Sequence, residues 1–271
     1  MKTFNAIVLF LLVVAANAQT NNTDNPSEYI PAEIYGGKVE FKRFLQQELF
    51  YPKKAILSKT EGTVELAFII DVKTGKTSGL HVKKHVSPDI DEEAIRLYKM
   101  LQFEIPAYRG GKATIYSVLK IKFSIKNYNK SVKKRGYKDS RFKPAEHDTS
   151  MVIYRDNQLK VKPKIVFDKG INSLSHFIQR NLKYPPNTLQ LNLKGTVTLQ
   201  FVVEPTGRIT NIKLLKGLGG GATAETERLL KLLTWQAAEK DGVKVRCLKE
   251  FEVNYHLSSD DGKEYVPNSN F

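Results

Sequence analysis

Three groups of residues have types and spacing that could do chemistry. A glycine-rich run, Gly217-x-Gly219-Gly220-Gly221, stands between an expected strand and an expected helix, where phosphate-binding loops occur. His81 and His85 would share one face of an extended strand, and two imidazoles on one face could bind a metal ion. The run Asp91-Glu92-Glu93 offers neighbouring carboxylates, the groups that general acid–base catalysis uses.

None of these groups is complete enough to indicate an enzyme, a metal site or a cofactor site. The glycine run lacks the Gly-Lys-Ser/Thr of a phosphate-binding loop and follows a hairpin strand rather than a βαβ unit. No third metal ligand accompanies the two histidines, and such a pair is typical of side chains on an exposed strand. The acidic run is typical of a helix start, where negative charge meets the positive end of the helix dipole. We therefore expect no catalysis, no cofactor, no metal and no small-molecule substrate.

The sequence contains an internal repeat. The two copies are offset by 133 residues before a Thr-Gly turn and by 132 residues after it. Phe44-x-Gln46-x-x-Leu49-x-Tyr51-Pro52 returns as Phe177-x-Gln179-x-x-Leu182-x-Tyr184-Pro185. Gly62-Thr63-Val64 returns as Gly195-Thr196-Val197, and Arg96-Leu97-x-Lys99 as Arg228-Leu229-x-Lys231. A period this long indicates a duplicated domain rather than a solenoid repeat. None of the three chemical groups occurs in both copies, so the domain is not built around them.

Each copy must supply the same elements to position these motifs. In copy two the spacing of Leu174, Phe177 and Ile178 predicts an amphipathic helix that the proline after Tyr184 ends. Alternation predicts a strand over 197–203, a turn at 205–207 and a return strand over 209–215. A second helix over 223–233 and a last strand over 251–257 complete the unit.

Copy one repeats this order, with strands over 63–71 and 77–86, a helix opening at Asp91 and a last strand over 119–125. The alternation breaks at Val118-Leu119 and at Glu250-Phe251, which indicates a β-bulge in each last strand. The fold class is therefore α+β: two tandem small domains, each a three-stranded antiparallel sheet packed against two helices.

The first residues indicate a signal peptide. Lys2 supplies positive charge, 7–16 is apolar, and Ala16-Asn17-Ala18 forms a small-x-small cleavage site before Gln19. The expected parts are a signal peptide over 1–18, domain one over 30–126, a basic linker over 127–161, domain two over 162–258 and a tail over 259–271. The expected location is the periplasm. Cys247 is the only cysteine, so an intrachain disulfide is excluded.

The net charge of +15 is concentrated between the copies. Residues 126–164 hold twelve Lys or Arg against four Asp or Glu. Behind a signal peptide this excess argues against nucleic acid and favours an acidic partner, peptidoglycan or an anionic envelope surface. A solvated, self-repelling linker explains the same charge equally well.

In both copies the motifs resemble those of the TonB C-terminal domain. The resemblance rests on "FLQQELFYP…EGTVELAFIID" and "FIQRNLKYP…KGTVTLQFVVEPTGRITNIKLLKGLG", and on the tryptophan after the second helix of copy two. Copy one lacks the glycine-rich junction and has Phe103 where copy two has Trp235. The matching motif positions are Tyr51, Pro52, Gly62, Tyr184, Pro185, Gly195 and Trp235.

This resemblance implies a protein that binds short peptide segments of outer-membrane transporters or other envelope proteins. The peptide would pair with the edge of the last strand, which is β-augmentation. The implied edge residues are Leu119, Ile121 and Phe123 in copy one and Phe251, Val253 and Tyr255 in copy two. The residues before the Tyr-Pro pairs, which would lie near the docked peptide, are Glu48, Phe50, Asn181 and Lys183.

Two departures from an energy-transducing TonB leave other functions open. The predicted signal peptide has a cleavage site, whereas a transducer needs an uncleaved membrane anchor. The segment 19–31 contains only 13 residues and is not a long, proline-rich spacer. Fully extended, such a segment spans at most about 45 Å. A soluble tandem adaptor is the first hypothesis. A membrane-anchored transducer and an envelope structural protein that binds peptidoglycan or lipopolysaccharide through the basic linker are the others. Neither the partner peptide nor the transported substrate is encoded in these patterns.

We expect cleavage between Ala18 and Gln19, because a small-x-small site directly follows a short apolar stretch. Mass spectrometry of the protein purified from envelope fractions should find Gln19 at the mature N-terminus. A chain that keeps Met1 and stays in membrane pellets at high salt would instead support the anchored transducer.

Overall fold

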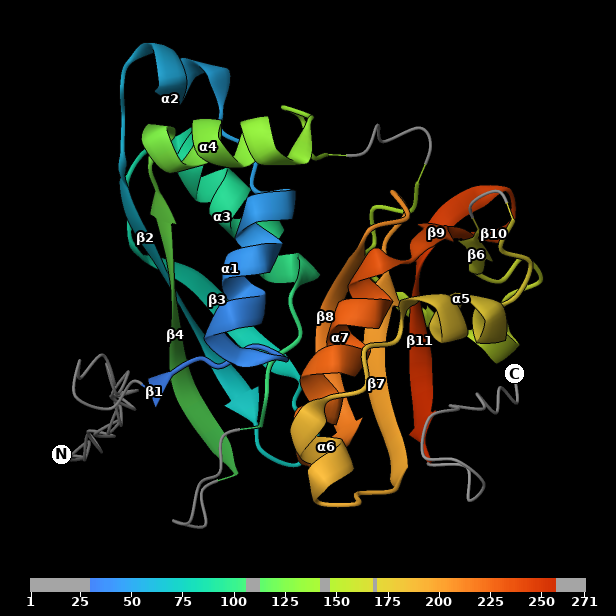
Figure 1. Ribbon diagram of the computed structural model, residues 1–271. Helices are drawn as coiled ribbons and strands as arrows, with labels where there is room; N and C mark the ends of the chain where they lie inside the picture. The colour runs from blue at the N-terminus through green and yellow to red at the C-terminus, as the bar shows by residue number, and fades with distance from the viewer. Residues whose placement is uncertain (1–29, 106–112, 142–146, 168–169, 257–271) are drawn as a thin grey trace, which may run out of the picture.

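The computed structural model describes residues 30–105, 113–141, 147–167 and 170–256, in which each copy has one main sheet (Figure 1). In copy one, β2 (Gly62–Asp71) lies between β3 (Thr77–Lys84) and β4 (Thr114–Phe123) and is antiparallel to both. A two-residue strand, β1 (Ile30–Pro31), adds in parallel to the outer side of β4. The sheet order is therefore β1-β4-β2-β3.

Two helices complete the core of copy one. α1 (Gly37–Glu48) buries Phe44, and α3 (Pro88–Met100) buries Ile90 and Leu97, against alternate side chains of β2 and β4. Val64 and Ile121 face each other across the pair of strands, and neither is exposed. Alternate strand residues and one face of each helix therefore supply a single apolar core.

Copy two repeats this frame and adds strands to it. β7 (Gly195–Val203) lies between β8 (Ile209–Lys216) and the long β11 (Val243–Tyr255), with α5 (Leu174–Asn181) and α7 (Ala222–Leu232) packed against them. β10 (Ala238–Lys240) pairs with the start of β11, and β5 (Ile153–Arg155) adds to β11 in parallel. β6 (Lys164–Val166) and β9 (Thr234–Gln236) form a separate ribbon.

The expected α+β fold and the order helix–strand–strand–helix–strand are confirmed in both copies. Two short helices after the Tyr-Pro pairs, α2 (Lys53–Leu57) and α6 (Pro186–Gln190), were not expected. The predicted bulges in the last strands are wrong, because β4 and β11 pair with their central strands in unbroken register. The register shifts lie on the other side, between β2 and β3 and between β7 and β8.

The predicted last strand of copy one also extends too far. β4 ends at Phe123, and Ile125 is instead the first residue of α4 (Ile125–Arg135). α4 packs against α1, and the Nη1 atom of Arg135 donates to the carbonyl oxygens of Gln46, Gln47 and Leu49 at 3.0–3.1 Å. A cation at the end of α1 satisfies carbonyls that a helix leaves without partners.

The segment expected as a basic linker thus contains ordered elements. Besides α4 it holds β5 and a 3-10 turn over Asp156–Gln158. The predicted signal peptide and the C-terminal tail lie outside the described residues. Among the residues that the structure describes, no helix has both the length and the apolar character needed to cross a bilayer.

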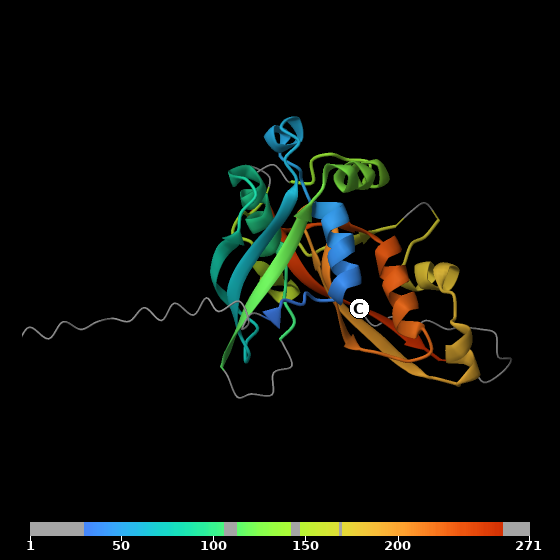
Figure 2. The same cartoon turned by 90° about the vertical axis from the view of Figure 1, so that its left-hand side faces the viewer.

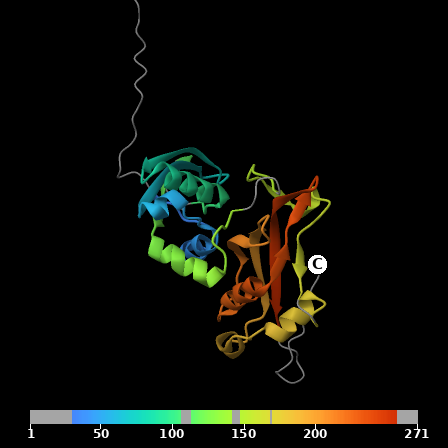
Figure 3. The ribbon, with the colours of Figure 1, turned by 90° about the horizontal axis from the view of Figure 1, so that it is seen from above.

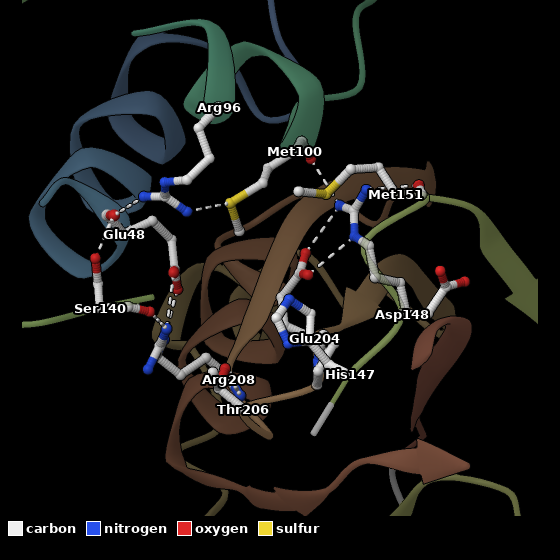
Figure 4. Close-up of a pocket in the computed structure, with 12 residues that line it drawn as sticks. Glu48, Arg96, Met100, Ser140, His147, Asp148, Met151, Glu204, Thr206 and Arg208 are labelled. Atoms are coloured by element: carbon white, nitrogen blue, oxygen red, sulfur yellow. Dashed lines mark hydrogen bonds and ion pairs between the residues drawn. The ribbon is translucent and has the colours of Figure 1, made fainter. Parts of the chain in front are cut away.

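The two copies meet through buried polar groups, and Figure 3 shows them side by side. Asn211 of β8 accepts from the amide of Gln102 at 2.7 Å and donates to the carbonyl oxygen of Met100 at 2.9 Å. Arg208 pairs with Glu48 at 2.5 Å, and both side chains line the pocket drawn in Figure 4. Arg246 donates to the same Met100 carbonyl at 2.7 Å. The copies are joined by directional bonds as well as by contact.

Asn211 is expected to be a sensitive residue of this interface. Its φ of 53° suits asparagine and costs alanine about 1 kcal/mol. Loss of its two hydrogen bonds across the copies should cost about 2 kcal/mol more. Asn211→Ala should therefore lower the free energy of unfolding by about 3 kcal/mol, measured by urea denaturation. Asn211→Gly is the matched control, because glycine tolerates the backbone angle but lacks the side chain. A glycine variant as stable as the wild type would show that the side-chain bonds contribute nothing.

Candidate functional site

The last strand of copy one has an edge that is only partly covered. One side of β4 pairs with β2 along its whole length, and the other side pairs with β1 only at Ser117 and Val118. The Ala32 amide donates to the Val118 carbonyl oxygen at 3.0 Å, so the main chain of Val118 faces outward. Main-chain groups of alternate residues face the same side of a strand. The amides and carbonyls of Lys120 and Lys122 therefore face the open part of this edge.

The last strand of copy two has a longer open edge. β11 pairs with β7 from Cys247 to Tyr255 on one side, while β5 covers only 246–248 on the other. The Asp148 amide donates to the Lys244 carbonyl oxygen at 3.0 Å, which marks the even-numbered main-chain groups as outward-facing. Within the part of the chain that the structure describes, no strand pairs with the outer side of β11 over 249–255.

Both edges already hold an extended segment of the chain itself. β1 lies parallel to β4, and β5 lies parallel to β11, each coming from the sequence that precedes its copy. The two additions occupy similar positions in the two sheets, at the start of the region shared by the last strands. Each edge therefore holds an added parallel strand, and beyond it no other strand of the described residues pairs with the edge.

The predicted edge residues serve the core through their side chains. Leu119, Ile121 and Phe123 belong to the core of copy one, and Phe251, Val253 and Tyr255 to that of copy two. None of the six is more than 3% exposed. Any partner at these edges must therefore use the main chain, together with the outward side chains of the residues between them.

The Tyr-Pro motif fixes the last strand from within. Tyr51 packs edge-on against Phe123 with ring centroids 5.8 Å apart, and Tyr184 packs against Tyr255 at 5.5 Å in the same way. The Tyr51 hydroxyl donates to the carbonyl oxygen of Thr60 at 2.7 Å. The prolines of the motif, Pro52 and Pro185, precede the first turns of α2 and α6.

The remaining motif residues have structural positions. Gly62 and Gly195 begin β2 and β7. Trp235 is 7% exposed and packs on Phe201 with ring centroids 5.2 Å apart. These residues support the frame on which the edges stand and do not reach the edges themselves.

A glutamate–arginine pair occurs at the same place in each copy. In copy one Glu93 accepts from the amide of Phe50 at 2.8 Å and pairs with Arg96, which donates to the carbonyl oxygen of Glu48 at 2.6 Å. The α3 pair therefore binds both the donor and the acceptor that the end of α1 presents. Burial raises the pKa of Glu93, against the opposing effect of Arg96.

The equivalent pair of copy two is Glu225 and Arg228. Glu225 accepts from the amide of Lys183 at 2.6 Å, and Arg228 donates to the carbonyl oxygen of Asn181. Burial acts to raise the pKa of Glu225, but the Arg228 hydrogen bond and the Lys183 amide outweigh it, so the pKa lies below its usual value. We call these two pairs, Glu93–Arg96 and Glu225–Arg228, the helix clamps. Sequence reasoning missed them, although the repeated arginines were visible.

The four residues expected near a docked peptide are therefore held by the clamps through their main chains. The side chain of Glu48 is 1% exposed and points across the copies to Arg208. The ring of Phe50 lies under the guanidinium of Arg141, 3.6 Å from its centre. The side chain of Glu48 thus lies in the interface between the copies.

The three groups with chemical potential have structural roles. His85 contacts the Asp91 carboxylate at 2.8 Å at the start of α3, while the ring of His81 lies against the Gly79 carbonyl. Gly220 has a φ of 69°, and a Cβ there would lie 2.6 Å from the amide nitrogen of Thr188, so only glycine fits. In the described residues no three His, Cys, Asp or Glu side chains form a group able to hold a metal.

Comparison with known families explains why the frame occurs twice. A family model described as Gram-negative bacterial TonB protein C-terminal matches residues 47–125 and 180–257, more than half of the chain. The chain belongs to the TonB C-terminal family. No curated protein matches it. The TonB C-terminal family is a transport-associated, non-enzymatic domain family of the cell envelope. Nearly all of α4 lies beyond the matched segments.

Two buried tyrosines, one from each tyrosine–aromatic contact, should make the TonB-like frame sensitive to alkali. Burial raises the pKa of both Tyr51 and Tyr255 to about 12. Below pH 10 both residues are protonated in the folded and the unfolded chain; above it only the unfolded chain loses protons, so stability falls as pH rises. The fall should reach about 1 kcal/mol per tyrosine at pH 11.

Tyr51→Phe and Tyr255→Phe should each make this decline shallower. The measurement is the free energy of unfolding by urea at several pH values between 8 and 11. Each variant should be less stable than the wild type at pH 8, because a hydroxyl hydrogen bond is lost. Curves that stay parallel to the wild type up to pH 11 would show that neither tyrosine causes the decline.

Proposed function

We propose that this protein binds short extended segments of outer-membrane transporters or other envelope proteins by strand addition, as part of TonB-dependent transport. One observation carries the proposal: the edges of β4 and β11 each hold a parallel segment of the chain itself and remain open beyond it. An edge that accepts one extended segment has the geometry to accept another. The family membership supplies the class of partner.

The side-chain pattern supports binding through the main chain. The inward side chains of both last strands are used by the cores, so the free hydrogen-bonding groups of the edges belong to the backbone. Backbone pairing tolerates different partner sequences, while the outward side chains set preference among them. In this proposal the protein is a periplasmic binding module and not an enzyme.

One observation weakens the alternative of an envelope structural protein anchored by its basic linker. The guanidinium of Arg135, in that linker, donates hydrogen bonds to the end of α1 and to the carbonyl oxygens of Tyr137 and Lys138. It is therefore part of the fold and not a free charge for peptidoglycan. The alternative of an anchored transducer concerns residues outside those described.

A proline on the open edge of β11 should separate strand addition from side-chain contact. Asn254→Pro removes an outward-facing amide donor, which an edge strand tolerates, and Asn254→Ala keeps the donor. The proline variant should bind about tenfold more weakly, through loss of the hydrogen bond and of its neighbours' alignment. The alanine variant should bind like the wild type.

The probes are fluorescent peptides that cover the N-terminal segments of TonB-dependent transporters, measured by anisotropy on the chain from residue 19 onward. A circular dichroism melt must show that both variants remain folded. A folded Asn254→Pro variant that binds these peptides as well as the wild type does would remove β11 as the receptor edge.

A further inference from the structure

A basic groove runs beside the open edge of β4. It lies between α1, α4 and the end of β4, encloses about 600 Å³, and the three elements stand together in Figure 2. A second hollow of about 480 Å³ continues it toward β1, past Val118, Leu119 and Lys120. Lys38 and Phe41 line both hollows, so the two form one channel along the edge.

The walls of this groove carry positive charge from three elements. Five lysines line it: Lys38, Lys42, Lys122, Lys130 and Lys134. Among the described residues no aspartate or glutamate lines this first hollow, and none of its five lysines pairs with a carboxylate. The second hollow is lined by Glu33 and Glu65, and Glu65 pairs with Lys120 at 3.1 Å. Five neighbouring ammonium groups without counter-ions repel one another, so an anionic occupant would relieve that repulsion.

The floor of the groove is apolar. Phe41, Leu45, Leu49 and Tyr128 lie between the lysines, and the first two are only partly buried. Tyr128 packs on Tyr51 with ring centroids 5.5 Å apart, and Arg135 joins the far end of α4 to α1. The amide of Ile125, at the start of α4, donates to the Glu61 carboxylate. Both ends of the α4 wall are therefore fixed by contacts.

We propose that this groove receives an acidic, extended peptide segment that pairs with the main chain of Lys120 and Lys122 and places its carboxylates among the five lysines. The inference rests on the proposed strand addition and assigns copy one a class of partner. An anionic lipid or polysaccharide would satisfy the lysines but would leave the edge amides and the apolar floor without partners. A peptide with alternating acidic and apolar residues satisfies all three.

The matching edge of copy two has the opposite character. Its outward positions include Glu250 and Glu252, where copy one has Val118 and Lys120. Copy two is therefore expected to disfavour the acidic segment that copy one takes.

The test uses a labelled peptide of about ten residues in which glutamate alternates with valine, and a matched peptide with glutamine for each glutamate. Anisotropy is measured on the chain from residue 19 onward at about 20 and about 200 mM salt, where screening differs strongly. The acidic peptide should bind at least about tenfold more tightly than the glutamine peptide at low salt, and this preference should shrink at high salt.

Two double variants isolate the groove lysines. Lys130→Gln with Lys134→Gln removes two lining charges, and binding of the acidic peptide should weaken about fivefold to tenfold. Lys126→Gln with Lys133→Gln removes the same charge from exposed positions of α4 that do not line the groove. This control should bind like the wild type, and a thermal melt should confirm that both proteins fold.

Lys122→Pro and Lys122→Gln separate this inference from strand addition itself. If both peptides bind equally and only Lys122→Pro abolishes binding, strand addition stands and acidic selection is overturned. If the two double variants weaken binding equally, the groove is not the site and the inference also fails. Phosphatidylglycerol vesicles that bind more tightly than the acidic peptide, with the same dependence on Lys130 and Lys134, would reassign the groove to an anionic membrane surface.

Discussion

The helix clamps are the constraint on which the rest of each copy depends. One glutamate and one arginine of the second helix bind the amide and the carbonyl at the end of the first helix. That contact fixes where the chain enters the Tyr-Pro pair, and the tyrosine then supports the last strand through its aromatic neighbour. The position of the first helix beside the last strand, and so the space along the edge, follows from this chain of contacts.

Duplication has kept this frame and changed what lies outside it. The clamps, the tyrosine–aromatic contacts and the parallel strand on the outer edge occur in both copies. The outward side chains do not: copy one presents lysines along its open edge, and copy two presents glutamates. α4 builds a wall only on copy one among the described residues. The buried contacts are thus shared by the copies, and the differences lie at surface positions, where the proposed selectivity would arise.

The sequence was sufficient to predict what depends on local pattern. Helical spacing in Leu174 and Phe177, alternation in the strands and the Tyr-Pro stops gave the order of elements, because periodicity reports which face is buried. The repeat also argued against a site at the glycine run or the histidines, because neither group occurs in both copies. Resemblance to a family directed attention to the last strands, whose open edges the structure then displayed.

What could not be predicted depends on contacts distant in the chain. α4 was taken for a linker because its many lysines outnumber its one buried aromatic residue, Tyr128. β5 was not predicted because a strand of three residues is too short to show alternation. The role of Asn211 depends on bonds to residues more than 100 positions away. Glu48 was expected beside a peptide, yet its partner Arg208 lies in the other copy. No local spacing reveals such pairs.

The bonds that Asn211 and Arg208 make across the copies have a consequence for affinity. They hold the two open edges at one separation, so under the proposed strand addition the edges would act as a linked pair and not as two independent sites. For a partner that carries two suitable segments, capture of the first turns capture of the second into an intramolecular event. Such an event is governed by effective concentration, typically in the millimolar range for short flexible connections, and not by the concentration of free partner. Two individually weak edges can then yield a long-lived complex whose tightness depends on the spacing of the partner's segments.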